Sequence, residues 1–352
     1  PKATPSRYVA HRVVALGTPA TTRALSGSGH VAGLHETSGT PEGKPRPFVW
    51  STATGVQEIP GLIPPDAATD GDFEITAVNN AGVVVGSAPD GFHRFGVPFA
   101  WSRESGPRSL DSVDPAWSSN SGTARDINDA GQIVGTYRFA NFGIAGLWNG
   151  LDQVPVTILS APRMDVHGER INESGRVLAR YSSMFSLTWS EGDQFAVPLP
   201  RLGDQTPLAQ AISDTGYIIS HVRVSEQTEG PEGPVRRSFV RLGLVDPGGA
   251  IHAAPVDIPH TEGFRAAVSN EGAVVANHSA DSRPFYWTVA GGVRDLLGEA
   301  GVSGQARSIR PAGAVVGRFQ VTAETPPAAF VWTSDGGFVN LNDRLDPAAG
   351  IH

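Results

Sequence analysis

The sequence predicts an all-β fold, a seven-bladed β-propeller of four-stranded antiparallel blades, because one glycine-centred pattern recurs seven times. The repeats lie 41 to 56 residues apart, a period typical of solenoids, propellers and arrays. In each repeat an apolar residue lies four positions before the glycine, a β-branched residue two positions after it and a small residue four positions after it. The seven glycines are Gly29, Gly82, Gly131, Gly175, Gly216, Gly272 and Gly313.

The glycine ends a polar turn between two predicted strands. In the third repeat this turn is Asn128–Gly131, which lies between two β-rich runs. Asparagine or serine caps such a turn, and glycine takes the positive φ angle that a bulged hairpin loop requires. The strand that leaves the turn is apolar at two successive positions, such as Val84 and Val85. This pattern predicts that neighbouring sheets cover both faces of the strand.

Each repeat continues with a third strand that carries aromatic residues and a fourth that ends in an aliphatic residue. The triplets that mark the third strand are Phe48–Trp50, Phe99–Trp101, Phe285–Trp287 and Phe330–Trp332, while other repeats keep only Trp148, Trp189 or Phe239. The fourth strands end at residues such as Leu110, Leu159, Leu296 and Leu341. Four short strands per repeat, stacked radially, form the blades of a propeller.

The two ends of the chain are expected to meet in one blade and close the ring. Val13–Leu16 has the pattern of a fourth strand with no repeat before it, and Phe338–Leu341 that of the fourth strand of the last repeat. We therefore predict a single domain over residues 1–352. A right-handed parallel β-helix is the alternative fold, but its repeats are usually shorter and need no Asn-x-x-Gly hairpin.

The run Ile127–Gly135, of pattern Ile-Asn-x-x-Gly-x-Ile-Val-Gly, together with the Phe-x-Trp strand and the final leucine, resembles the HAF-repeat family of probable extracellular repeats. The resemblance covers roughly residues 20 to 342. The His-Ala-Phe triplet of the family is absent, and the aligned residues are Arg46–Phe48, Val97–Phe99 and Ala328–Phe330. The resemblance implies an exported, β-rich repeat protein and carries no catalytic residues to transfer.

The composition and net charge of the chain exclude several classes of binding partner. The net charge of -8 argues against nucleic acid and against an anionic membrane surface, since both need a basic footprint. The chain has no cysteine, which excludes disulfides and thiolate metal sites. It contains no apolar stretch of membrane-spanning length and no signal peptide, so we expect no membrane insertion. We expect a monomer, and only the family resemblance suggests an extracellular location.

When the seven repeats are aligned, two positions, here called the variable columns, carry a different residue in nearly every blade. The positions expected in the core, the core columns, stay constant. One variable column lies just past the small residue of the second strand, at Leu34-His35, Ser87-Ala88, Thr136-Tyr137, Arg180-Tyr181, His221-Val222, Asn277-His278 and Arg318-Phe319. The other lies at the start of the innermost strand, at Arg23, Thr76, Arg125, Glu169, Gln210, Ala266 and Arg307. Variable residues on a rigid scaffold are where binding usually occurs. We therefore predict one asymmetric axial pocket for a small organic or sugar-like molecule.

The residue types in these columns suit acid/base chemistry without a cofactor, of lyase, isomerase or cyclase type. The predicted catalytic residues are Glu169 and His221 as bases and Tyr181 and His278 as acids. The predicted ligand-binding residues are Arg180, Arg318, Arg125, Arg307, Tyr137, His35, Phe319 and Trp117, the arginines for an anion and the aromatic residues for a ring or apolar chain. We predict no metal site, although His35, His221 and His278 would be the ligands if they converged.

Two other functions are compatible with the sequence. An exported, non-catalytic propeller that binds a glycan or a cell-surface partner would also have binding residues that differ from blade to blade. A protein scaffold would expose aromatic residues, for which the sequence offers Phe92, Phe95, Phe139 and Phe142. The segment 221–238 is the longest expected loop, either a lid or solvated surface.

Overall fold

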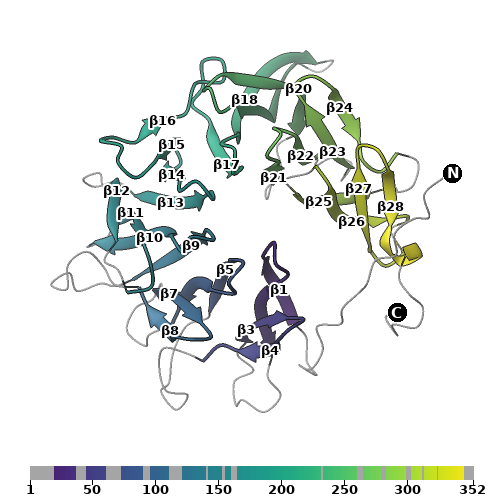
Figure 1. Ribbon diagram of the computed structural model, residues 1–352. Helices are drawn as coiled ribbons and strands as arrows, with labels where there is room; N and C mark the ends of the chain where they lie inside the picture. Colours follow the sequence, from purple (N-terminus) through teal and green to yellow (C-terminus); the bar gives the residue numbers. More distant parts are fainter. Residues whose placement is uncertain are drawn as a thin grey trace. The chain divides into compact units, whose positions relative to one another are not determined.

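The computed structural model describes most of the chain, and Figure 1 shows its strands. The described residues are 20–36, 45–60, 73–89, 96–110, 121–139, 142–152, 155–159, 165–230, 233–259, 265–278, 283–298, 303–310, 313–322 and 324–344. They divide between two compact units, here called the N-terminal unit (His11–Pro198) and the C-terminal unit (Leu199–His352). Val13–Leu16 lies outside the described residues, so closure of the ring by the two chain ends stays a prediction, as does the single domain.

The N-terminal unit contains four sheets of four strands. The first is β1 (Ala20–Leu25), β2 (Val31–Glu36), β3 (Pro45–Ser51) and β4 (Gly55–Glu58). The second is β5 (Glu74–Val78), β6 (Val84–Ala88), β7 (Val97–Ser102) and β8 (Gly106–Ser109). The third is β9 (Gly122–Ile127), β10 (Ile133–Phe139), β11 (Phe142–Trp148) and β12 (Val156–Leu159). The fourth is β13 (Val166–Ile171), β14 (Val177–Tyr181), β15 (Phe185–Trp189) and β16 (Val197–Pro198).

The C-terminal unit contains three further sheets of four strands. The fifth is β17 (Leu208–Ile212), β18 (Ile218–Gly230), β19 (Gly233–Val245) and β20 (Ile251–Pro259). The sixth is β21 (Ala266–Val268), β22 (Val274–His278), β23 (Arg283–Thr288) and β24 (Gly292–Asp295). The seventh is β25 (Ser303–Ile309), β26 (Val315–Gln320), β27 (Ala328–Thr333) and β28 (Gly337–Asn340). One helix occurs in the described residues, the 3-10 turn η1 (Leu341–Arg344), and no helix there is long and apolar enough to span a membrane.

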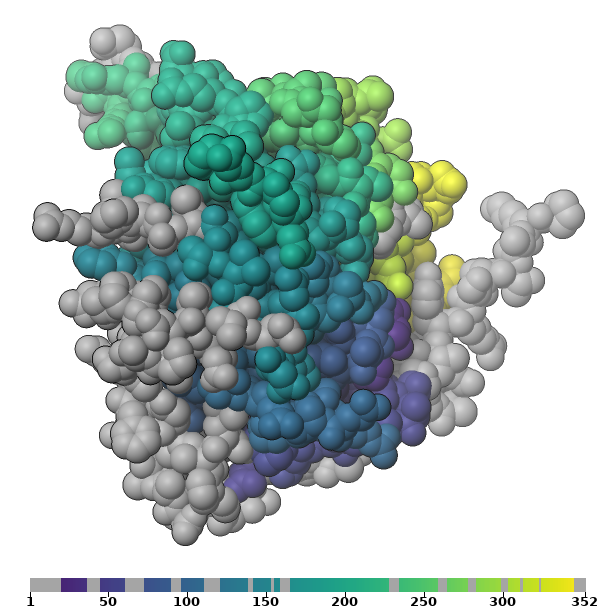
Figure 2. Space-filling view, turned by 60° about the vertical axis from the view of Figure 1, so that its left-hand side comes forward, coloured from purple at the N-terminus to yellow at the C-terminus, as the bar shows by residue number. Residues whose placement is uncertain are grey.

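Every sheet is an antiparallel meander in which each strand pairs with the next along the chain. The fold is therefore an all-β, seven-bladed propeller of four-stranded antiparallel blades, and the predicted fold class is confirmed. Within the N-terminal unit the first strands β1, β5, β9 and β13 pack against their successors in order. Figure 2 shows these blades stacked in sequence order, from purple through blue to teal.

The hydrophobic core lies between blades rather than within them. Val84 and Val85 are both fully buried, but Val84 packs with the first blade and Val85 with the third. Val274 and Val275 divide in the same way between the fifth and the seventh blade. Side chains alternate across a strand, so a second strand between two neighbours needs apolar residues at successive positions. This confirms the predicted burial on both faces for the second strands of the second and sixth blades, whereas Val316 in the second strand of the seventh blade is exposed.

The Asn-x-x-Gly turns have the predicted geometry. All seven repeat glycines have positive φ angles, between 76° and 93°. In the third blade the Asn128 side-chain oxygen accepts a hydrogen bond from the Gln132 amide at 2.9 Å, and the Gly131 amide donates to the Asn128 carbonyl at 3.1 Å. The asparagine side chain therefore closes the turn from inside, which is the local role expected of asparagine.

The same asparagines also connect successive blades of the N-terminal unit. The Asn79 side-chain nitrogen donates to the Asn128 carbonyl, and that of Asn128 to the Asn172 carbonyl, each at 3.2 Å. The next residue of each turn forms a second series, in which the Asp129 carboxylate accepts from the Asn80 amide at 2.8 Å and the Glu173 carboxylate from the Asp129 amide at 2.9 Å. The turn motif thus joins the blades as well as shaping each hairpin.

The fifth blade differs from the sequence prediction. The expected loop 221–238 continues the ladder of β18 and β19, whose strands have 13 residues each. The ladder extends past the last pair with β17, at His221, and past the last pair with β20, at Phe239. The described residues of this segment, which the sequence analysis expects to be a loop, satisfy their backbone groups as a two-stranded ribbon instead.

Replacing Asn128 by alanine tests the role of the turn. The side chain is buried, so its loss removes the acceptor for the Gln132 amide and the donor to the Asn172 carbonyl and leaves both without that bond. We expect Asn128→Ala to lower the free energy of unfolding by about 2 kcal/mol in urea denaturation. Glu104→Ala, an exposed turn residue of the same unit, should change it by less than about 0.5 kcal/mol. Equal effects of the two substitutions would contradict this role.

Candidate functional site

The first strands are irregular at one position in six of the seven blades. The strand pairing skips a residue there, which is the mark of a β-bulge. The skipped residues, here called the bulge residues, are Arg23, Thr76, Arg125, Glu169, Gln210 and Arg307. These are the residues of the predicted first-strand column, except for Ala266 of the sixth blade, which is paired regularly. Bulges re-aim a side chain and are common beside active sites.

The small residue of the second strand explains where the bulge forms. A Cβ atom added to Gly86 would lie 1.8 Å from the Glu74 carbonyl oxygen, and one added to Gly135 would lie 2.3 Å from that of Thr123. The bulged first strand thus approaches the second-strand backbone closely, which a residue with no side chain permits. In these blades glycine provides the space for this approach, whereas the fourth and fifth blades form the bulge with Ala179 and Ser220 at the same position.

The two variable columns meet in space. The residue eleven positions after each bulge residue lies on the second strand and is here called its counterpart. In the fourth blade Glu169 and its counterpart Arg180 form an ion pair with 2.8 Å between Oε1 and Nη2. In the fifth blade Gln210 Nε2 lies 3.2 Å from Nδ1 of its counterpart His221. In these two blades, residues of the two predicted columns therefore contact each other.

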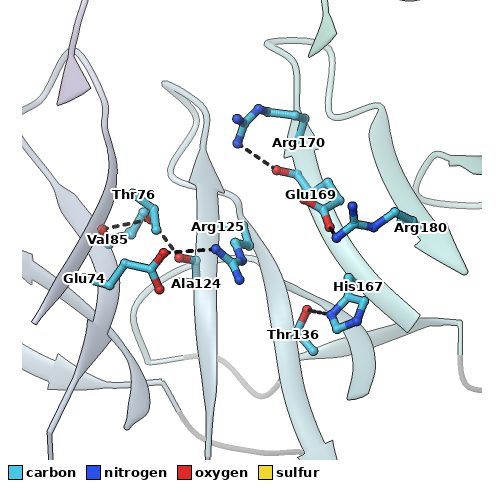
Figure 3. A network of polar contacts seen from close by, with 10 residues as sticks. All are labelled: Glu74, Thr76, Val85, Ala124, Arg125, Thr136, His167, Glu169, Arg170 and Arg180. Atoms are coloured by element: carbon cyan, nitrogen blue, oxygen red, sulfur yellow. Dashed lines mark hydrogen bonds and ion pairs between the residues drawn. The ribbon is translucent and has the colours of Figure 1, made fainter. Parts of the chain in front are cut away.

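Figure 3 shows the polar network that these residues form across the second, third and fourth blades. Arg125 Nη1 donates to Glu74 Oε1 at 3.1 Å, which joins the third blade to the second. Thr76 donates to the Ala124 carbonyl at 2.8 Å. The Glu169–Arg180 pair lies in the fourth blade, and the Arg180 and Glu169 side chains are 42% and 31% exposed. The network brings carboxylates and guanidinium groups together where solvent still reaches them.

His167 belongs to this network although the sequence analysis did not select it. It is paired with Arg180 across the β13–β14 ladder, and its Nδ1 lies 3.4 Å from Thr136 Oγ1 of the preceding blade. Burial lowers the pKa of His167, against the opposing effect of the Glu169 charge. The imidazole is therefore neutral at neutral pH. Its position two residues before the bulge was the available signal, since side chains at i and i+2 share a strand face.

Asp126 and Glu74 were also missed by the sequence analysis. Asp126 Oδ1 accepts from the Ile127 amide and Oδ2 from the Ile171 amide, each at 3.1 Å, so the carboxylate bridges the third and fourth blades. Burial raises the pKa of Asp126, and the charge of Arg170 and the two amide hydrogen bonds offset this only in part. No spacing rule indicates such a residue, because its partners come from another repeat.

Several residues that were predicted to bind a ligand are buried in the hydrophobic core of the structure. Tyr137 is buried, contacts Trp148 edge-on and has its hydroxyl 2.7 Å from Thr157 Oγ1. Phe319 is buried between Phe330 and Phe338. Strand alternation is the reason, because their neighbours Thr136 and Arg318 take the other face. Both rings thus belong to the core, and the prediction that they stack on a ligand finds no support.

The remaining aromatic and histidine candidates are dispersed. His35 is buried against Phe48, with its Nε2 3.4 Å from Glu58 Oε1, and Tyr181 stacks on Phe185 at 5.0 Å. His221 lies in the C-terminal unit with Gln210. His278 ends β22, and Trp117 lies outside the described residues. Among the described residues no group of three or more histidine, aspartate or glutamate side chains is placed to hold a metal ion.

No protein-family model and no curated protein sequence matches the chain, so the HAF-repeat resemblance finds no support there. The chain is similar in structure to a streptogramin B lyase (TM-score 0.46, 11% identity, 86% of this chain and 91% of that chain). It is also similar to YCF48 bound to a D1 peptide (0.47, 13%, 86% and 92%) and to the WD40 propeller domain of Doa1 (0.41, 11%, 94% and 96%). Likeness at these levels carries no argument about function.

Replacing Asp126 by asparagine tests the bridging carboxylate. Because its folded-state pKa lies above the unfolded value, the folded protein loses stability as pH rises through that pKa, and Asp126→Asn removes this loss. We expect the unfolding free energy of the variant, relative to wild type, to increase from about pH 4 to pH 7 in urea denaturation. The lost acceptor adds an offset that does not vary with pH. A difference that does not change with pH for Asp126→Asn would contradict the assignment.

Proposed function

We propose that the chain binds a small anionic organic or sugar-like molecule at the bulge residues of its N-terminal unit and acts on it by acid/base chemistry without a cofactor. The observation that carries this proposal is the juxtaposition of Glu169, Arg180 and the neutral His167 in one blade. A base, a carboxylate and a guanidinium at one partly exposed position are the groups that proton abstraction beside a carboxylate requires.

Arg180 is the proposed anion-binding group. One of its nitrogens is held by Glu169, and its Nε has no hydrogen-bond partner among the described residues. The Glu169 contact fixes the plane of the guanidinium, which is the geometry that binds a carboxylate through two parallel hydrogen bonds. The same group stabilises the negative charge that develops on the substrate oxygen when a neighbouring C–H bond breaks.

His167 is the proposed base. Its Nδ1 is placed next to Thr136, which leaves Nε2 to accept the proton while the C–H electrons form an enolate held by Arg180. The carboxylate of Glu169 raises the proton affinity of the ring and so stabilises the imidazolium once it forms. Departure of a leaving group from the next carbon gives elimination, and return of the proton to another carbon gives isomerisation. In this proposal His167 takes the role of base, which the sequence analysis expected of Glu169 or His221.

A second function is favoured by the way these charges are paired. Arg180 is neutralised by Glu169 and Arg125 by Glu74, so the surface holds fixed hydrogen-bonding groups without a free strong base. Such a surface suits a non-catalytic propeller that binds a glycan or a cell-surface partner. The extracellular location implied by the repeat resemblance belongs to this candidate.

Binding and proton exchange separate the two candidates. Malate and D-glucuronate are the probes, with binding followed by calorimetry and exchange of the C–H proton beside the carboxylate followed by proton NMR in D₂O. Arg180→Gln should weaken binding about tenfold or more, because it removes a charged bidentate contact. Since the Glu169–Arg180 pair is partly solvated, the cost to stability should stay below about 1 kcal/mol. Arg103→Gln, an exposed turn residue, is the matched control.

His167→Asn should keep binding and abolish exchange. In the wild type the exchange rate should rise with pH as His167 loses its proton, with a midpoint below about 6.5, the value for an unperturbed imidazole. If a probe binds but shows no C–H exchange that His167→Asn abolishes, the non-catalytic candidate is favoured. Binding that is unchanged in Arg180→Gln would contradict both.

A further inference from the structure

Three arginines come together in the C-terminal unit. Arg307 is the bulge residue of β25, and Arg318 is its counterpart on β26. Arg265 directly precedes β21, the first strand of the neighbouring blade, and β21 packs against β25. All three side chains belong to exposed residues. The bulge residue Arg307, its counterpart Arg318 and Arg265 of the neighbouring blade thus lie close enough for their charges to interact.

The equivalent positions of the other blades show what is unusual here. In the fourth blade the bulge residue and its counterpart are Glu169 and Arg180, which attract each other at 2.8 Å. In the fifth they are Gln210 and His221, which lie within hydrogen-bond distance. In the seventh both are arginine, so the carboxylate that Glu169 supplies to Arg180 has no equivalent for Arg318.

The described residues provide no negative charge for this cluster. The arginine ion pairs found among them involve other arginines, and Arg307, Arg318 and Arg265 have none. Arg318 Nη2 donates to Gln305 Oε1 at 3.1 Å, which orients the guanidinium without neutralising it. Partial burial lowers the pKa of Arg307, and the charges of Arg318 and Arg265 lower it further. A bound anion would remove this repulsion.

We propose that Arg265, Arg307 and Arg318 form a binding site for a small oxyanion that carries two negative charges, a phosphate ester or a dicarboxylate. Guanidinium groups bind such anions through paired, charge-assisted hydrogen bonds, and three of them match a dianion better than a single carboxylate. The bulge and the Arg318–Gln305 bond hold two of the groups in place before the anion arrives. A localised positive potential on a chain of net charge -8 also attracts the anion from solution.

Calorimetric titration of the full chain tests this site. The probes are inorganic phosphate and succinate at pH 7.5, with sodium chloride used to hold the ionic strength constant and as the reference anion. Arg307→Gln and Arg318→Gln should each weaken binding of the preferred probe about tenfold or more, and Arg318→Lys should weaken it less because the charge remains. Arg294→Gln, an exposed arginine on β24 of the same unit, is the matched control and should leave binding unchanged.

Stability without an anion gives a second measurement. At low salt and without phosphate, Arg307→Gln should raise the melting temperature, because it removes like-charge repulsion, whereas Arg294→Gln should not. The site is overturned if neither phosphate nor succinate binds more tightly than chloride, or if Arg307→Gln binds the preferred probe as tightly as the wild type. Arg180→Gln and His167→Asn should leave phosphate binding intact, so this site and the proposed function fail separately.

Discussion

The burial of second strands between neighbouring blades of a unit is the constraint on which the rest of the structure depends. A second strand whose two faces both pack against other sheets contributes to two hydrophobic cores, as β6 does through Val84 and Val85. Within either unit a blade therefore has little core of its own and is stable only beside its neighbours. The same alternation decides which side chains are structural, since Tyr137 takes one face and packs on Trp148 while Thr136 takes the other and approaches His167.

The polar motif of the repeat solves two problems that this packing creates. A tight turn between packed blades carries backbone groups that must be hydrogen-bonded, and the Asn128 side chain satisfies the Gln132 amide within its own turn and the Asn172 carbonyl of the next. The close approach of first and second strands needs a small residue, which Gly86 and Gly135 provide. These requirements recur in the blades, and the residues that meet them recur with the repeat.

In six of the seven blades the bulge gives one position that the scaffold does not constrain. Packing and turn chemistry do not depend on which side chain it carries, so this position holds Thr76, Arg125, Glu169, Gln210 and Arg307 in different blades. Its counterpart on the second strand varies as well. One geometric site therefore supports an ion pair in the fourth blade, a hydrogen-bond contact in the fifth and a like-charge pair in the seventh. Chemical variety on a constant backbone is how a propeller acquires a specific function.

The sequence by itself determined the all-β class, the number of blades, the strand order and the turn geometry, because each depends on residues close together within one repeat. It also located the two variable columns, including Glu169 and Arg180. Only the tertiary structure decided which of those residues pack in the core, as Tyr137 and Phe319 do, and which reach solvent. It alone revealed Asp126 and His167, whose environment comes from neighbouring blades. The physical reason is that burial and charge at these positions arise between repeats, whereas a sequence pattern reports only what recurs within one.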